Sequence, residues 1–158
     1  MVFKRKLKRY LFAAVMLVLA AYVALFIKDS VDSKNPEINL PVISVSTGFN
    51  PPYVVRAGYT WKFGFKTVYS PFVSPMDVPL MITDVPPKEN IVITFTALEE
   101  LCELFVAEGL GNEEFEKVYT WVTPEKEGIY VYRIHAQFEK GDIQYYFALQ
   151  VKEQNIQP

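Results

Sequence analysis

Two patterns of apolar and polar residues divide the chain into two regions. The first is an apolar run from residue 10 to residue 27 that contains no charged side chain. Eighteen helical residues at about 1.5 Å each span roughly 27 Å, close to the thickness of a hydrocarbon core. We therefore predict a transmembrane helix over 10–27, a polar stalk over 28–41, a folded domain over 42–153 and a short tail over 154–158.

The residues before the apolar run indicate its orientation. Five residues there are basic, namely Lys4, Arg5, Lys6, Lys8 and Arg9. A basic flank stays on the cytoplasmic side of a membrane, so residues 1–9 are predicted to be cytoplasmic and the domain extracytoplasmic. A cleaved signal peptide is the alternative, with a small-residue cleavage site at 18–20. The apolar run continues past that site without a helix breaker, which favours an uncleaved signal-anchor of a single-pass protein.

Beyond residue 41, apolar and polar residues alternate with a period of two, which predicts β-strands. The expected strands cover 42–47, 59–69, 91–96, 117–123, 129–138 and 143–151, with a short edge strand at 80–83. Proline-containing and glycine-containing segments between them predict turns and loops. The longest alternation predicts one buried face, formed by Tyr59, Trp61, Phe63, Phe65, Thr67 and Tyr69.

Segment 98–108 fits two structures. Leu98, Leu101, Cys102 and Phe105 have helical spacing, and glutamate and leucine favour helices. The same segment also alternates as a strand would. Its residues alone therefore leave helix and strand open, with a slight preference for helix.

The hairpin predicted over 129–151 carries a more specific pattern. Gly128 and Tyr130 match the Gly-x-Tyr at the start of strand F in an immunoglobulin-like β-sandwich, where the tyrosine is the corner residue. Tyr132 stands where antibody-type domains have a cysteine. The longer series resembles the end of the domain in a group of uncharacterised bacterial membrane-anchored cell-surface proteins. It consists of Gly128, Tyr130, Tyr132, Ala136, Phe138, Gly141, Tyr146 and Phe147.

The resemblance implies a mainly β fold, an immunoglobulin-like β-sandwich behind one N-terminal transmembrane helix, and it favours a strand over 101–108. It implies no catalytic residues. Five residues are expected to have structural roles: Trp61, Trp121, Gly128, Tyr130 and Tyr132. Tyr130 is expected to bury its ring beside Tyr132 and to bond its hydroxyl to the backbone of 123–127. The neighbours Tyr145 and Tyr146 point to opposite faces and are expected to differ in burial.

The net charge and the cysteine content limit which partners and which covalent cross-links the domain can have. After the five leading basic residues, eleven basic and eighteen acidic residues remain, a net charge of −7. That charge, with the extracytoplasmic location, argues against a nucleic-acid partner. Cys102 is the only cysteine, so the domain has no internal disulfide, and its apolar neighbours predict a buried, inert thiol.

The chain offers few residues for catalysis or metal binding. His135, the only histidine, falls on the more polar face of its strand and is expected to face solvent. One histidine without cysteine ligands does not make a zinc site, and the acidic residues of 99–116 lack the alternation of a calcium loop. A nucleophilic pair of Cys102 and His135 would form only through folding. We therefore predict no catalytic, cofactor-binding or metal-binding residues, and no enzyme.

Exposed aromatic and methionine side chains in proline-containing loops are the remaining candidates, because such side chains mark partner surfaces. The expected partner surface consists of Phe49, Tyr53, Tyr69, Phe72 and Met76. The sequence thus predicts a membrane-tethered extracytoplasmic binding or interaction module, whose partner is another extracytoplasmic or membrane protein. The alternatives are a structural accessory subunit that pairs through its helix and, less favoured, an enzyme.

Overall fold

The computed structural model describes residues 2–48 and 50–153, so Phe49 and the predicted tail 154–158 lie outside the described residues. The protein is mainly β, with 42% of residues in strands and 22% in helices. The chain forms two compact units. One comprises Met1–Asn39 and Lys62–Val68, and the other comprises Leu40–Trp61 and Tyr69–Pro158.

The N-terminal helix α1 covers Val2–Asp32, and its segment Lys8–Asp32 is long and apolar enough to cross a membrane. The apolar side chains of this segment are exposed on all sides. The helix is longer than predicted, because no proline or glycine interrupts it before Pro36. The first part of the expected stalk is therefore helical, and a short second helix, α2, follows at Pro36–Asn39.

The long aromatic alternation is a hairpin, and our prediction of a single strand over 59–69 is wrong. Strand β2 covers Val55–Phe63 and β3 covers Lys66–Ser70. Between them Gly64 turns the chain with a φ of 56°, a conformation that glycine adopts without steric cost. As a result Phe65 and Tyr69 are exposed, whereas the aromatic residues of β2 are buried: Tyr59, Trp61 and Phe63.

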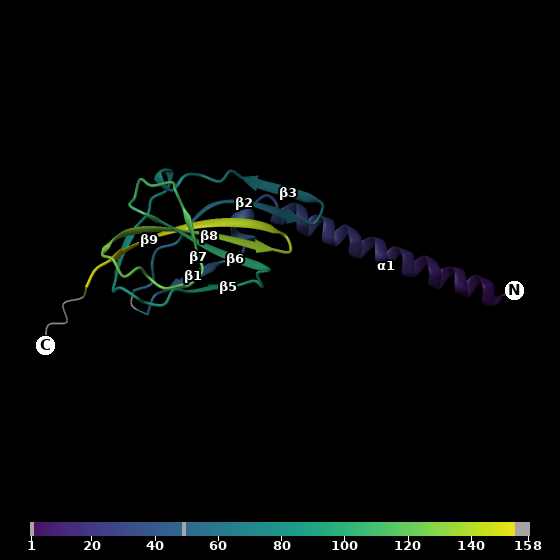
Figure 1. The fold of residues 1–158 in the computed structure, drawn as a ribbon. Coiled ribbons are helices and arrows are strands. Elements are labelled where there is room, and N and C mark those ends of the chain that lie inside the picture. The colour runs from purple at the N-terminus through teal and green to yellow at the C-terminus, as the bar shows by residue number, and fades with distance from the viewer. Residues whose placement is uncertain (1, 49, 154–158) are drawn as a thin grey trace. The chain divides into compact units, whose positions relative to one another are not determined.

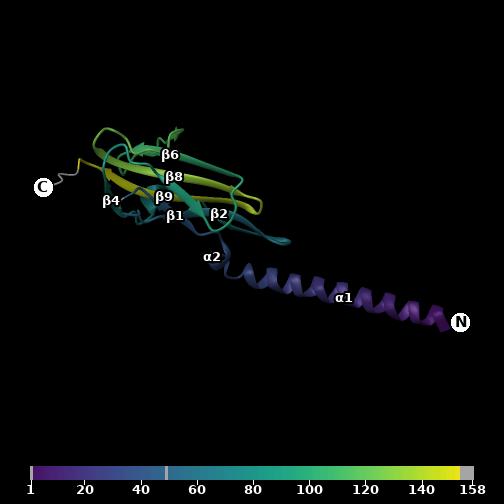
Figure 2. The ribbon, with the colours of Figure 1, turned by 90° about the horizontal axis from the view of Figure 1, so that it is seen from below.

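The main sheet has the strand order β3-β2-β9-β8-β6-β7, and Figure 2 shows β6, β8 and β9 side by side. Besides β2, β3 and a further strand described below, this sheet contains β6 (Leu101–Glu108), β7 (Glu116–Val118), β8 (Gly128–Phe138) and β9 (Gly141–Val151). Strands β8 and β9 pair along their whole length, which confirms the predicted hairpin. The helix considered for 98–108 is wrong from Leu101 onward, because pairing with β8 outweighs local helix propensity.

A smaller sheet pairs β1 (Ile43–Ser46) with β5 (Val92–Phe95). The two strands confirm those predicted over 42–47 and 91–96, whereas their pairing was not predicted. Only the start of the strand predicted over 117–123 lies in β7. The chain then passes beside β5, where the Ile91 N–H donates to the Trp121 carbonyl at 2.8 Å and Asn90 bridges Val122. Strand β4 (Ile82–Val85) follows a 3-10 turn at Pro75–Asp77, lies close to the predicted edge strand and joins the main sheet, where it runs parallel to β9. Figure 1 shows the other strands.

The smaller sheet packs on one face of the main sheet, here called the first face. The Phe95 ring of β5 lies 5.4 Å from the Phe138 ring and 6.3 Å from the Tyr145 ring, measured between centroids. Alternate residues of β8 point into this core and confirm the predicted buried row, which comprises Tyr130, Tyr132, Ile134, Ala136 and Phe138. The two sheets therefore form a sandwich-like core.

Tyr130 behaves as the corner prediction requires. Its side chain is buried, and its hydroxyl donates to the Lys126 carbonyl at 2.9 Å, inside the predicted segment 123–127. Tyr132 stacks on Phe147 with ring centroids 4.8 Å apart and planes 6° apart. An aromatic pair thus fills this part of the core.

The opposite face, here called the second face, is also covered. Its apolar cluster comprises Ala57, Val131, Tyr146 and Ala148, packed against Val73, Val78, Leu80 and Phe115. Residues 71–80, here called the strap, cross this face. The expected difference in burial between Tyr145 and Tyr146 is therefore wrong: their exposed fractions are 1% and 3%.

Gly58 lets the strap approach the sheet. A Cβ atom at this position would lie 2.6 Å from the Pro71 carbonyl oxygen and 2.7 Å from the Phe72 Cα, and the φ of Gly58 is 152°. Close by, the Val73 N–H donates to the Ala57 carbonyl at 2.9 Å. The strap is thus held to β2 by backbone contacts that a larger residue at position 58 would disrupt.

Candidate functional site

Four of the five predicted surface residues are exposed. Their exposed fractions are 54% for Tyr53, 63% for Tyr69, 45% for Phe72 and 66% for Met76, and the fifth, Phe49, lies outside the described residues. Tyr69 is the penultimate residue of β3, whereas Phe72 and Met76 belong to the strap. Three of the predicted residues therefore lie within one continuous segment of the chain, 69–76.

The residues predicted to be structural are mostly buried. Trp61 is 5% exposed, and its ring lies edge-on to Phe138 at 5.5 Å. Trp121 is half-buried and holds β5 through its carbonyl. Gly128 begins β8, where a Cβ would lie 3.4 Å from the Tyr130 ring.

The pairing of β6, β8 and β9 places side chains of the second face in two neighbouring rows. One row contains Phe105, Arg133 and Tyr146, and the next contains Glu103, His135 and Gln144. Directly opposed residues on adjacent strands project from the same face, so each row lies across the sheet. The second face therefore passes from an apolar cluster, through a row centred on Arg133, to a charged row.

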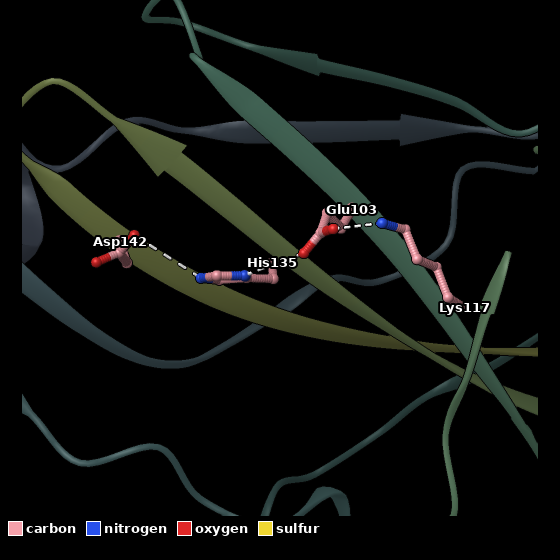
Figure 3. A network of polar contacts seen from close by, with 4 residues as sticks. All are labelled: Glu103, Lys117, His135 and Asp142. Atoms are coloured by element: carbon pink, nitrogen blue, oxygen red, sulfur yellow. Dashed lines mark hydrogen bonds and ion pairs between the residues drawn. The ribbon is translucent and has the colours of Figure 1, made fainter. Parts of the chain in front are cut away.

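His135 lies in a chain of charged groups (Figure 3). Its Nδ1 is 3.7 Å from a Glu103 oxygen, and its Nε2 is 3.8 Å from an Asp142 oxygen. The other Glu103 oxygen accepts a hydrogen bond from Lys117 Nζ at 2.5 Å. This bond lowers the pKa of Glu103 and raises that of Lys117.

His135 is half-buried between two carboxylates, so our expectation of a simply solvent-facing histidine is incomplete. Both distances exceed a hydrogen bond, so these pairs attract only when the imidazole is protonated. Within residues 2–48 and 50–153, no group of three or more His, Cys, Asp or Glu side chains is arranged to hold a metal ion.

Cys102 and His135 do not form a nucleophilic pair. Cys102 opposes Ala136 on the first face, whereas the next residue, Glu103, opposes His135 on the second. The thiol is half-buried, and burial, with smaller effects of Glu99 and Glu103, raises its pKa to about 12. The prediction of an inert thiol among apolar residues is consistent with this environment.

A cavity of about 310 Å³ lies between the strap and the second face. Its lining is formed by Phe72, Val73, Ser74, Pro75, Glu113, Phe115, Arg133, Gln144 and Tyr146. The Arg133 guanidinium lies 4.6 Å from the centroids of both the Phe105 ring and the Phe115 ring. The side chain is therefore held by two cation–π contacts.

Hydrogen bonds fix the walls of this cavity. The Tyr146 hydroxyl donates to the Val73 carbonyl at 3.2 Å and accepts from Gln144 Nε2 at 2.7 Å. Burial raises the pKa of Tyr146, and the positive charge of Arg133 acts against that shift. At the rim, the Ser74 hydroxyl donates to a Glu113 oxygen at 2.5 Å. The strap, the sheet and the segment before β7 are thus joined around Arg133.

An acidic hollow of about 330 Å³ lies elsewhere, lined by Val106, Ala107, Glu108, Asn112, Glu114, Glu116 and Tyr130. Glu108 pairs with Lys126 at 2.6 Å, and both side chains are largely exposed. Exposed ion pairs contribute little to stability. Its glutamates are among the acidic residues of 99–116, which lack the alternation of a calcium loop.

Sequence reasoning missed Arg133. Its alternation in β8 placed it on a polar face, and nothing local indicated that Phe115 of a distant loop would cover it. The strand predicted over 101–108 was the one sequence feature that could have indicated this site, because pairing with β8 brings Phe105 beside Arg133.

Comparisons with protein-family models, with curated proteins and with solved structures found no match to this chain.

Proposed function

We propose that this protein is a single-pass membrane protein that holds an immunoglobulin-like β-sandwich outside the cytoplasm as a binding or interaction module. The observation that carries the proposal is the helix Lys8–Asp32, whose apolar side chains are exposed on every side while the β domain has its own buried core. A fully apolar exposed helix needs a lipid environment. The basic residues before it favour a cytoplasmic N-terminus.

Strand order supports the immunoglobulin-like assignment. In that fold strands C, F and G share one sheet, and strands A, B and E share the other. Here β6, β8 and β9 are neighbours in one sheet, while β1 and β5 make up the other, with an isolated bridge from Asn90 to Val122 just before β5. The Tyr130–Lys126 hydrogen bond has the form of a tyrosine corner. The β2–β3 hairpin and the parallel strand β4 are additions to the basic pattern.

The binding role rests on the second face and the strap. Large apolar side chains that stay exposed beside a cavity are typical of partner surfaces. Tyr69, Phe72 and Met76 are large and exposed, and Phe72 also lines the cavity around Arg133.

Protease treatment of intact cells that carry the full chain with a C-terminal epitope tests the proposal. We expect the protease to remove the epitope without lysis and to leave a membrane-bound fragment containing α1. An epitope protected until the cells are lysed would contradict the orientation. A mature protein that begins near Ala21 would show a cleaved signal peptide in place of an anchor.

The second candidate function is an accessory subunit that pairs through its helix. One face of α1 forms an apolar hollow of about 470 Å³, lined by Leu11, Ala14, Val15, Val18, Leu19 and Tyr22. Replacing residues 10–27 by a polyleucine span of equal length preserves a tether but removes this face. Partner capture that survives the replacement assigns binding to the domain, whereas its loss assigns binding to the helix.

A further inference from the structure

We propose that the Arg133 cavity is a binding site for an aromatic α-amino-acid unit, either a free amino acid or the C-terminal residue of a peptide. In this arrangement Arg133 binds the ligand carboxylate and Glu113 accepts a hydrogen bond from the α-nitrogen. The ligand side chain packs against Phe72 and Phe115. The inference deepens the binding role proposed above, on which it rests, by naming a ligand class.

Arg133 has the geometry of a carboxylate receptor. The Phe105 and Phe115 rings both lie 4.6 Å from its guanidinium carbon, and the guanidinium also donates to the Tyr146 hydroxyl, so its remaining N–H donors are available to a ligand. The ion pairs among the described residues do not include Arg133. A carboxylate binds a guanidinium edge through two parallel hydrogen bonds, which lysine does not reproduce.

The other polar groups of the lining are already engaged with one another. The Tyr146 hydroxyl has a donor and an acceptor partner, and the Ser74 hydroxyl accepts from the Met76 N–H and donates to Glu113. Glu113 is exposed and adds a negative charge to the lining. One cation and one anion in the same lining match a ligand with a carboxylate and an adjacent N–H or ammonium group.

The cavity is small, and its lining combines aromatic and apolar side chains with polar and charged ones. Phe72, Pro75 and Phe115 line it, and its volume of about 310 Å³ is near the lower limit for ligand pockets. Such a volume suits one aromatic residue. Pro75 is buried and the Phe115 ring stacks on Tyr146 at 6.0 Å, so the walls are already in place.

Ligand titrations of the purified full chain in detergent test the site, with calorimetry and saturation-transfer NMR as readouts. The probes are N-acetylphenylalanine, its amide, free phenylalanine and a tetrapeptide that ends in phenylalanine. We expect the acid to bind and its amide to bind about tenfold more weakly, a difference of about 1.4 kcal/mol. If free phenylalanine binds more tightly than the tetrapeptide, the ligand is a free amino acid. If the tetrapeptide binds more tightly, the ligand is the C-terminal residue of a peptide.

Two variants assign the contacts. Arg133→Lys keeps the positive charge but loses the two parallel N–H donors of the guanidinium. We expect it to weaken the binding of N-acetylphenylalanine about tenfold. Glu113→Gln changes an exposed rim residue, so it tests the site even if Arg133→Lys fails to fold. Glu113→Gln should weaken the binding of free phenylalanine more than the binding of 3-phenylpropanoate, which has no nitrogen. Lys152→Met is the control, because Lys152 pairs with Asp84 outside the cavity and its loss should change nothing.

Three results would overturn the site. One is no binding of any probe up to about 10 mM. The others are equal binding of the acid and the amide, or affinities that neither variant alters. The membrane tether proposed above is tested by protease access alone, so either proposal can fail while the other stands.

Discussion

Two tyrosines on one face of β8 provide a matched test of how the core is held together. Tyr130 donates its hydroxyl to the Lys126 carbonyl, whereas the buried Tyr132 hydroxyl has no hydrogen-bond partner among the described residues. Replacing each by phenylalanine makes the same chemical change two residues apart. We expect the two substitutions to alter the free energy of unfolding in opposite directions.

The magnitudes follow from the two environments. Tyr130→Phe removes one hydrogen bond, and the exposed Lys126 backbone can rehydrate, so the loss is about 1 kcal/mol. Tyr132→Phe keeps the ring on Phe147 and removes an unsatisfied hydroxyl, which should stabilise the domain by about 1–3 kcal/mol. Tyr130→Ala also opens a cavity and should cost about 3–5 kcal/mol, a large part of the ~5–15 kcal/mol available to a small domain.

Urea titration of a fragment that begins at Asn39, followed by tryptophan fluorescence, measures these differences. With a denaturant slope of about 2 kcal/mol per M, the two phenylalanine variants should unfold about 1–2 M apart. A Tyr132→Phe midpoint below that of the parent would show that the hydroxyl has a partner, and would refute the reasoning. A Tyr130→Ala midpoint equal to the parent's would remove the best support for the tyrosine corner.

Four further outcomes are expected. The fragment from Asn39 should fold alone as a β-rich monomer, and a far-ultraviolet circular dichroism spectrum dominated by helix would contradict this. Gly58→Ala should destabilise it by more than about 1 kcal/mol in urea, because of the positive φ and the contact with Pro71. Cys102 should resist iodoacetamide at pH 8 until urea is added, because its pKa is about 12; equal rates in both states would contradict it. Burial raises the pKa of Tyr132, so stability should fall as pH rises above about 10, less steeply in Tyr132→Phe; identical slopes would refute this.

Local patterns predicted those parts of the fold that depend on neighbouring residues. The β8–β9 hairpin has a short turn and strict alternation, and the tyrosine corner joins residues only four apart. The apolar helix likewise needs no tertiary partner to be recognised. These features follow from periodicity and turn chemistry within one segment.

Other features depend on contacts that no local pattern contains. The alternation over 59–69 continues across the turn at Gly64, so period two alone does not reveal the hairpin. Tyr145 and Tyr146 are both buried because the strap covers the second face, and nothing around these tyrosines indicates the strap. The Arg133 cavity also needs three distant segments, so neither its volume nor its lining was predictable from the sequence.

The position of β9 has a consequence for how the chain is made. This last strand pairs with β8 on one side and with β2 and β4 on the other. Val55 therefore pairs only once Tyr146 is available, and Val85 only once Val151 is available. During synthesis β2 and β4 leave the ribosome well before β9 does. Strands that are far apart in the sequence also pair slowly. The main sheet is therefore completed only after residue 151 has emerged, and a chain that stops before β9 lacks the strand on which the others assemble.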